Sequence, residues 1–365
     1  MSVPQRVLIT ILTLLLFSTY VHILQRLHYP QPEQAAAPAF TQPASNASSS
    51  STPHVEPKKP YSHILVVART KAEDVSWIEQ EFPSIDTAIY TVDDETATLR
   101  PPQNKGHESM VYLSHIIGNY NDLPDTSIFI HAHKYSWHNN DLLYQDTASM
   151  LRRLNHERVA REGYMSLRCH SVPGCPNWIS LSETTFDPVK VEQWYLPQVW
   201  NELHPGVPMP DTLAAPCCSQ FAVTRARIQS VPLSEWVRYR DWLLNTNLTD
   251  DVSGRIWEYN WHFILTGETS FCPPTNECYC DGYGVCFGSA RKTDEWFELR
   301  EARKNIETKL EEARESNRST AELRRRAVAL DVYLAQTLNE ALERGMDPRE
   351  RALEVGREWK EEDGF

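Results

Sequence analysis

Short apolar runs separated by amphipathic stretches dominate the middle of the chain. Three of these runs are rich in β-branched residues and predict buried strands: 63–69, 87–92 and 125–130. Between them, residues 75–82 and 110–120 place apolar side chains at helical spacing. An order of strand, helix and strand predicts a parallel sheet with right-handed crossovers, because that connection packs the helix back onto the sheet. We therefore expect a three-layer α/β domain over residues 61–290.

The pattern beyond residue 140 predicts mainly helices. We expect helices at 142–154, 191–203, 228–244 and 258–264, a loop at 169–181 and a strand at 219–224. In the 258–264 helix, Glu258 and His262 are four residues apart and would project from one face. From residue 291, leucines at three-and-four spacing lie among dense charges, which predicts two or three helices. These helices would form an antiparallel hairpin against the body or a coiled coil for self-association.

The N-terminus predicts a membrane anchor. Residues 7–24 form an apolar run of the length that spans a bilayer, after a short tail at 1–6. Gln25-Arg26-Leu27 follows in place of a small-residue cleavage site, so we favour a retained signal anchor over a cleaved signal peptide. Residues 25–60 are rich in Pro, Ala, Ser and Thr, which predicts a disordered stem. The body would then lie in the lumen of the endoplasmic reticulum or Golgi, or be secreted if the run is cleaved.

Charge and cysteine content narrow the function classes. The formal charge of −13 over 365 residues argues against nucleic-acid binding, which needs a basic surface. All eight cysteines follow residue 168, and their even number favours disulfides in an oxidising compartment. We expect Cys169 to pair with Cys175, whereas the other pairings cannot be deduced from the sequence. A zinc cluster over residues 272–286 is the alternative, although its spacing differs from that of ordinary zinc-binding pairs.

The strand at 125–130 ends in a group of imidazoles. His131 and His133 are two residues apart, so both would leave the same face of an extended backbone, and His138 follows. Ligands of open α/β sheets collect beyond the carboxyl ends of the strands. The histidines therefore mark a candidate site.

Several motifs together resemble a known family. They are Val66-Val-Ala-Arg69, Asn104-Lys-Gly-x-Glu108, Phe129-Ile-His131-x-His133, Cys218-Ser-Gln-Phe-Ala222, Glu258-Tyr-x-Trp-His262 and Cys278-Tyr-Cys280. As a set they resemble the largely fungal uncharacterised family known as domain of unknown function 3431, over about residues 61–288. The resemblance implies a body plan and no reaction.

The layout of anchor, stem and lumenal body is similar to that of Golgi glycosyltransferases. This resemblance implies a glycosyltransferase-A-like, Rossmann-like fold. It also implies an enzyme that transfers a sugar from a nucleotide donor to a glycan or glycoprotein acceptor. Such enzymes end a central strand in Asp-x-Asp, which holds a divalent metal, whereas this chain has His131-Ala-His133 there. Imidazole suits Mn²⁺ or Zn²⁺ better than Mg²⁺. The implied catalytic residues are Glu258, as the base, and His262; those contacting the donor are Arg69, Lys105 and Gln220. Arg69 or Lys105 could also face the diphosphate without a metal.

Two other function classes stay open. His131, His133 and His138 supply three nitrogen ligands, enough for the catalytic zinc of a metal-dependent hydrolase. However, Tyr135 and Ser136 stand where the metallo-β-lactamase fold has an acid. Alternatively, the histidines are hydrogen-bonded core residues of a non-catalytic, membrane-anchored binding protein.

Overall fold

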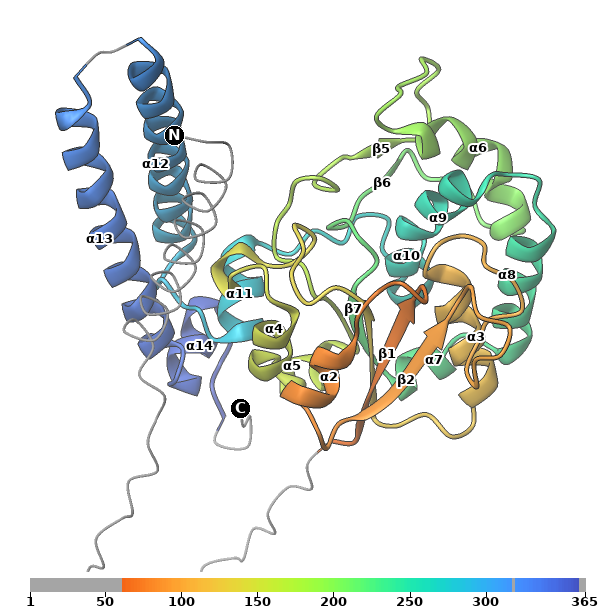
Figure 1. Ribbon diagram of the computed structural model, residues 1–365. Coiled ribbons are helices and arrows are strands. Elements are labelled where there is room, and N and C mark those ends of the chain that lie inside the picture. Colours follow the sequence, from red (N-terminus) through yellow and green to blue (C-terminus); the bar gives the residue numbers. More distant parts are fainter. Residues whose placement is uncertain (1–60, 317–318, 361–365) are drawn as a thin grey trace, which may run out of the picture. The chain divides into compact units, whose positions relative to one another are not determined.

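A mixed five-stranded sheet carries the fold (Figure 1). The computed structural model describes residues 61–316 and 319–360, so the predicted tail, anchor and stem lie outside the described residues. The strands are β1 (His63–Arg69), β2 (Asp86–Thr91), β3 (Thr126–His131), β4 (Tyr164–Ser166) and β7 (Phe221–Thr224), in the order β2-β1-β3-β7-β4. β2 and β3 both run parallel to β1, and β7 is antiparallel to β3 and β4. The prediction of an α/β domain with a parallel sheet is confirmed in this form.

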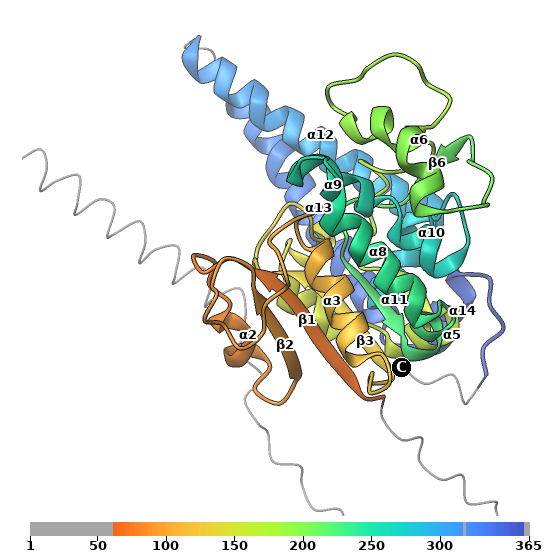
Figure 2. The same ribbon diagram turned by 90° about the vertical axis from the view of Figure 1, so that its right-hand side faces the viewer.

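Each face of the sheet has its own apolar core. Val66 and Phe129 point to the face covered by α3 (Ser109–Asn119), which lies in front of β1 and β3 in Figure 2. Their neighbours Leu65 and Ile128 point to the opposite core. Successive strand residues alternate between faces, and this alternation explains why the strands are apolar throughout.

The remaining elements surround these cores. They are α2 (Ser76–Glu81), a 3₁₀ turn (Asp141–Leu143), α4 (Thr147–Arg153), α5 (His156–Glu162), β5 (Ile179–Ser180), α6 (Val191–Leu203), β6 (Thr212–Leu213), α7 (Arg225–Gln229), α8 (Leu233–Asn245), α9 (Asp250–Glu258), α10 (Trp261–Thr266) and α11 (Thr275–Tyr283). The single helix predicted at 228–244 is wrong, because Pro232 lacks an N–H and separates α7 from α8. The helix predicted at 142–154 is likewise split, since Tyr144 and Gln145 adopt positive φ.

The helix predicted at 258–264 is also two helices. The N–H of Asn260 bonds to the Trp257 carbonyl, and its side-chain amide bonds to the Ile256 carbonyl. This side chain competes with the helical pattern and ends α9 at Glu258. Glu258 and His262 therefore lie on different helices, and the expectation that one helix face presents both is wrong.

The C-terminal helices form a hairpin that joins the body. They are α12 (Ala290–Glu315), α13 (Ala321–Arg344) and α14 (Pro348–Glu354). Ile306 and Ala327 pack between α12 and α13, which lie side by side in Figure 1. Trp296 reaches the core below the sheet, and Arg300 forms an ion pair with Asp141. Within the described ranges, no helix has both the length and the apolar character needed to cross a membrane.

Four disulfides link the described chain. They are Cys169–Cys278, Cys175–Cys272, Cys217–Cys218 and Cys280–Cys286. The expected Cys169–Cys175 pair is wrong, because the loop containing both cysteines lies beside residues 272–278 and bonds across to that segment. The alternative of a zinc cluster is wrong for the same reason, since every cysteine of residues 272–286 is oxidised.

Candidate functional site

The site lies where the strand order changes direction. The chain passes from β1 to β2 on one side and returns to β3 on the other side of β1. In open α/β sheets this arrangement leaves a crevice at the carboxyl ends of the two diverging strands. Arg69 ends β1 and His131 ends β3, so the crevice begins between these two residues.

Two adjoining cavities occupy this region. The strand-end cavity, of about 310 Å³, is lined by Arg69, Glu73, His133 and Asp250, among others. The disulfide cavity, of about 490 Å³, is lined by residues that include Trp137, Trp178, Glu192, Cys217, Cys218 and Glu258. Four residues line both cavities: His107, Glu108, His131 and His138. His131 and His138 therefore line both the strand-end cavity and the cavity that contains Glu258.

His131 and His138 contact each other at the junction of the cavities. Their Nδ1 atoms are 3.1 Å apart, so one ring donates a hydrogen bond to the other. Burial lowers the pKa of both rings, to about 4 for His138. Both imidazoles are therefore neutral at pH 7 and can donate or accept a proton through their free nitrogens. The Glu108 carboxylate and a hydrogen bond to the Cys218 backbone oppose the lowering of the His131 pKa.

His133 lies apart from these two rings. Its side chain is 59% exposed, and its Nε2 lies 3.4 Å from Glu73. The strand pairing of β3 stops at His131, and Trp77 holds the next carbonyl, that of Ala132, through a 2.9 Å hydrogen bond. The alternation of an extended strand therefore does not reach His133.

The three histidines do not assemble the expected metal site. In the described part of the chain, two groups of three potential ligands bring their atoms within 4.8 Å of one another, and neither contains these histidines. The groups are Cys217, Cys218 and Glu258, and Cys280, Cys286 and Glu354. Both contain a disulfide, whose sulfurs are not thiolates and do not fit a metal.

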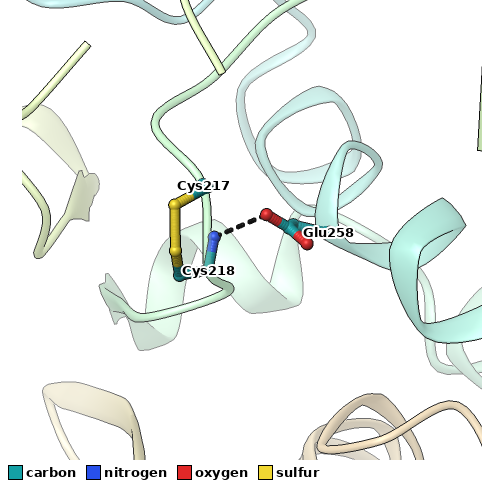
Figure 3. Close-up of side chains that lie close together, drawn as sticks. All are labelled: Cys217, Cys218 and Glu258. Carbon is teal, nitrogen blue, oxygen red and sulfur yellow. Dashed lines mark hydrogen bonds between the residues drawn. A yellow bond between two sulfur atoms is a disulfide. The ribbon is translucent and has the colours of Figure 1, made fainter. Parts of the chain in front are cut away.

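Among the titratable groups of the cavities, Glu258 is the one best suited to proton transfer near neutral pH. Burial raises its pKa to about 7, and the nearby carboxylates of Glu108 and Glu192 act in the same direction. The backbone N–H of Cys218 opposes this shift by donating a 2.7 Å hydrogen bond to Oε1, as Figure 3 shows. A carboxyl group with this pKa exchanges protons readily near neutral pH, which suits a general acid or base.

The Cys217–Cys218 disulfide shapes the wall opposite Glu258. The two bonded cysteines are adjacent in sequence, and φ is +86° at Cys218 and +48° at Ser219. This left-handed backbone turns the Cys218 N–H towards the carboxylate (Figure 3).

Helix α9 and the loop before α3 approach each other closely at Gly254. The Gly106 N–H donates a 2.6 Å hydrogen bond to Asp250 at the start of α9. One turn later, a Cβ on Gly254 would collide with the ring of His107. The glycine thus lets α9 approach the loop that positions Glu108.

The other predicted site residues, with the exception of Arg69, lie outside both cavities. His262 is buried and does not line either cavity. Its Nε2 lies 3.3 Å from the Thr269 carbonyl oxygen. Gln220 is buried behind the site, where it accepts from the His131 N–H and donates to Asn139. Lys105 donates to the Thr246 carbonyl. Arg69 lines the strand-end cavity, and its buried Nε has no hydrogen-bond partner among the described residues.

Sequence reasoning missed several residues of the site. Glu108 belongs to the Asn104-Lys-Gly-x-Glu108 motif and directly precedes α3, but its side chain makes no capping hydrogen bond to that helix. Glu192 belongs to none of the motifs, and its position in a helical pattern does not distinguish it from a surface charge. The cavity-lining role of Cys217 and Cys218 depends on a pairing that the sequence does not reveal.

Comparison with known proteins places the chain in a family. The sequence profile of the family described as "Protein of unknown function (DUF3431)" matches residues 65–281, more than half of the chain. The chain belongs to this family. The DUF3431 region contains Arg69, His131 and Glu258 and ends within α11, before the C-terminal hairpin. No curated protein and no solved structure matches the chain.

Proposed function

We propose that this DUF3431 protein is a glycosyltransferase-like enzyme that transfers a sugar from a nucleotide donor to an acceptor hydroxyl. The observation that supports this proposal most is the convergence of His131, His138 and Glu258 on one cavity at the crevice between β1 and β3. The crevice is where α/β sheets of this order bind nucleotides.

The geometry supports a role for Glu258 as the base. The acceptor oxygen attacks the anomeric carbon, its proton passes to the Glu258 carboxylate, and the bond from that carbon to the diphosphate breaks. The electron pair of the broken bond leaves with the diphosphate. With a pKa of about 7, a substantial fraction of Glu258 is ionised and available as a base at neutral pH.

Arg69 is the cation best placed for the diphosphate. It ends β1, lines the strand-end cavity and has a guanidinium N–H without a hydrogen-bond acceptor in the described chain. Lys105 is less suited, because its ammonium is bonded to the Thr246 carbonyl. We propose that Mn²⁺ or Zn²⁺ is tested as a cofactor, and the chemical step described above does not depend on it.

We propose the location on separate grounds. Four disulfides favour an oxidising compartment, such as the lumen of the endoplasmic reticulum or Golgi. The apolar run at 7–24 would anchor the protein there as a single-pass membrane protein. Self-association through α13 is a further part of the proposal, supported by the exposed Val328, Val332 and Tyr333.

The test is binding followed by transfer. We expect UDP or GDP, with or without Mn²⁺, to raise the melting temperature of the full chain, and Arg69→Gln to remove most of that rise. Glu258→Gln should keep nucleotide binding and lose transfer from a panel of nucleotide sugars. Glu79→Gln, on the exposed face of α2, is the matched control. Stabilisation by Zn²⁺ alone would instead favour a hydrolase, and no response to nucleotide or metal would favour a binding protein.

A further inference from the structure

The disulfide cavity has features that the proposed chemical step does not use. Its volume of about 490 Å³ suits a small organic ligand. Two tryptophans line it, together with the buried carboxyl group of Glu192 and an excess of acidic over basic side chains. These features together define the chemistry of a ligand.

Glu192 provides a buried acceptor with one long contact to a cation. Its side chain is on α6 and lines the cavity, and the residue is only 3% exposed. Arg255 Nη1 forms an ion pair with its Oε2 at 3.5 Å, and a carboxylate oxygen has the capacity to accept a second donor. Buried carboxylate oxygens in proteins nearly always accept hydrogen bonds. A hydroxyl group of a ligand would complete this site.

Trp137 and Trp178 provide flat apolar surfaces beside this acceptor. Trp137 is 57% exposed, and its ring is held by the Arg168 guanidinium at 5.3 Å and by His138 at 4.2 Å. The Lys190 ammonium lies 4.3 Å from the centroid of the Trp178 ring. Indoles fixed in this way combine a large contact area with little loss of conformational freedom on binding. They suit the apolar face of a sugar ring.

The charge of the wall limits which sugar can enter. Four acidic side chains line the cavity, those of Glu108, Glu192, Asp251 and Glu258, against the guanidinium of Arg255. Burial raises the pKa of Glu192 and Glu258, which reduces their share of the negative charge at pH 7. The cavity histidines His131 and His138 do not offset the negative charge at pH 7, because burial lowers the pKa of both rings. Like charges repel strongly in a partly desolvated space, so anionic ligands are disfavoured.

We infer that the disulfide cavity is a subsite for a neutral saccharide. The sugar ring stacks on Trp137, one hydroxyl donates to Glu192 Oε2, and another faces Glu258. The inference deepens the proposed function by naming the acceptor class, and only the role of the hydroxyl at Glu258 rests on it.

The experiment presents the full chain, without nucleotide, to an array of neutral, sialylated and sulfated oligosaccharides. We expect binding to neutral members and at least tenfold weaker binding to sialylated or sulfated forms of the same core. The best neutral oligosaccharide is then titrated by tryptophan fluorescence. Trp137→Ala should weaken it at least tenfold, whereas Trp194→Ala, an exposed indole on α6 outside the cavity, should leave it within twofold.

Two variants of Glu192 separate hydrogen bonding from charge. Glu192→Gln retains an acceptor oxygen, so it should keep neutral binding within about threefold and reduce the discrimination against acidic forms. Glu192→Ala should lose both properties; its thermal unfolding is recorded to verify folding. Equal binding of neutral and acidic forms, or equal effects of the two tryptophan variants, would overturn the inference. Nucleotide binding without saccharide binding overturns the subsite alone, and saccharide binding without nucleotide binding overturns the transferase alone.

Discussion

The backbone N–H of Cys218 donates a 2.7 Å hydrogen bond to Glu258 Oε1, across 40 residues of sequence. The donor belongs to a disulfide between adjacent cysteines, and the acceptor is a carboxyl group whose pKa burial raises to about 7. The bond stabilises the ionised carboxylate and lowers its pKa. The protonation of Glu258 therefore depends on the backbone conformation at Cys218.

Opening this disulfide should raise the pKa of Glu258. In Cys217→Ser/Cys218→Ser the backbone is free to leave its left-handed conformation and withdraw the N–H. A hydrogen bond to a charged group contributes about 1.5–3 kcal/mol, which corresponds to about one pKa unit or more. Titration of the Glu258 carboxyl by ¹³C NMR measures the shift. Cys280→Ser/Cys286→Ser is the control and should leave the titration unchanged; an unshifted titration in the first variant would show that the bond survives without the disulfide.

Glu258→Gln should stabilise the protein at alkaline pH. The folded pKa is about 7 against an ordinary value of 4.5, so the folded state retains a proton that the unfolded state has lost. This contribution to stability is fully present below pH 4.5 and is lost as the pH rises through 7. Glutamine is never ionised, so the variant should gain about 1–3 kcal/mol in free energy of unfolding at pH 8 relative to pH 5. Urea unfolding of both proteins at these two pH values measures the gain, and a gain equal at both would contradict the assignment.

Acid should unfold the protein through its buried histidines. Burial lowers the pKa of five of them to about 4, from an ordinary 6.5: His115, His138, His156, His170 and His262. The unfolded chain therefore takes up protons before the folded chain, and stability is lost as the pH falls from 6.5 towards 4. His115→Gln should make this decline shallower, because the variant takes up one proton fewer on unfolding. A free energy of unfolding that stays constant from pH 7 to 4.5 would refute the prediction.

The disulfides should contribute unequally to stability. Cys169–Cys278 closes a loop with a sequence separation of 109 residues, while Cys217–Cys218 joins neighbours. By loop-closure entropy, Cys169→Ser/Cys278→Ser should cost about 2–5 kcal/mol and Cys217→Ser/Cys218→Ser less than about 1 kcal/mol. Denaturant unfolding of the two double variants measures the difference. Equal losses would mean that the adjacent bridge stabilises the fold by local packing.

The parts of the fold that follow from local pattern could be predicted from the sequence. The bounds of β1 and α6 agree with the expected ranges, because apolar burial decides both. The predictions fail where a single residue interrupts the helical pattern of its neighbours. Pro232 divides a helical pattern, and Asn260 caps its own preceding turn.

The site was predictable only where its residues end a strand or belong to a motif. His131, His138 and Glu258 line one cavity, whereas His133 does not, and Gln220, Lys105 and His262 bond to partners that no spacing reveals. The pairing of Cys169 with Cys278 depends on the approach of two loops far apart in sequence. Such contacts are set by tertiary packing, which a single sequence does not encode locally.

Gly254 determines how far apart two sides of the disulfide cavity stand. Helix α9 carries Glu258 and Arg255, and the loop it touches carries His107 and Glu108. Because the contact has hydrogen where any other residue has carbon, even alanine would push the imidazole of His107 out of its place beside Asp250. The width of the cavity between Glu258 and Glu108 is thus set by the absence of one methyl group.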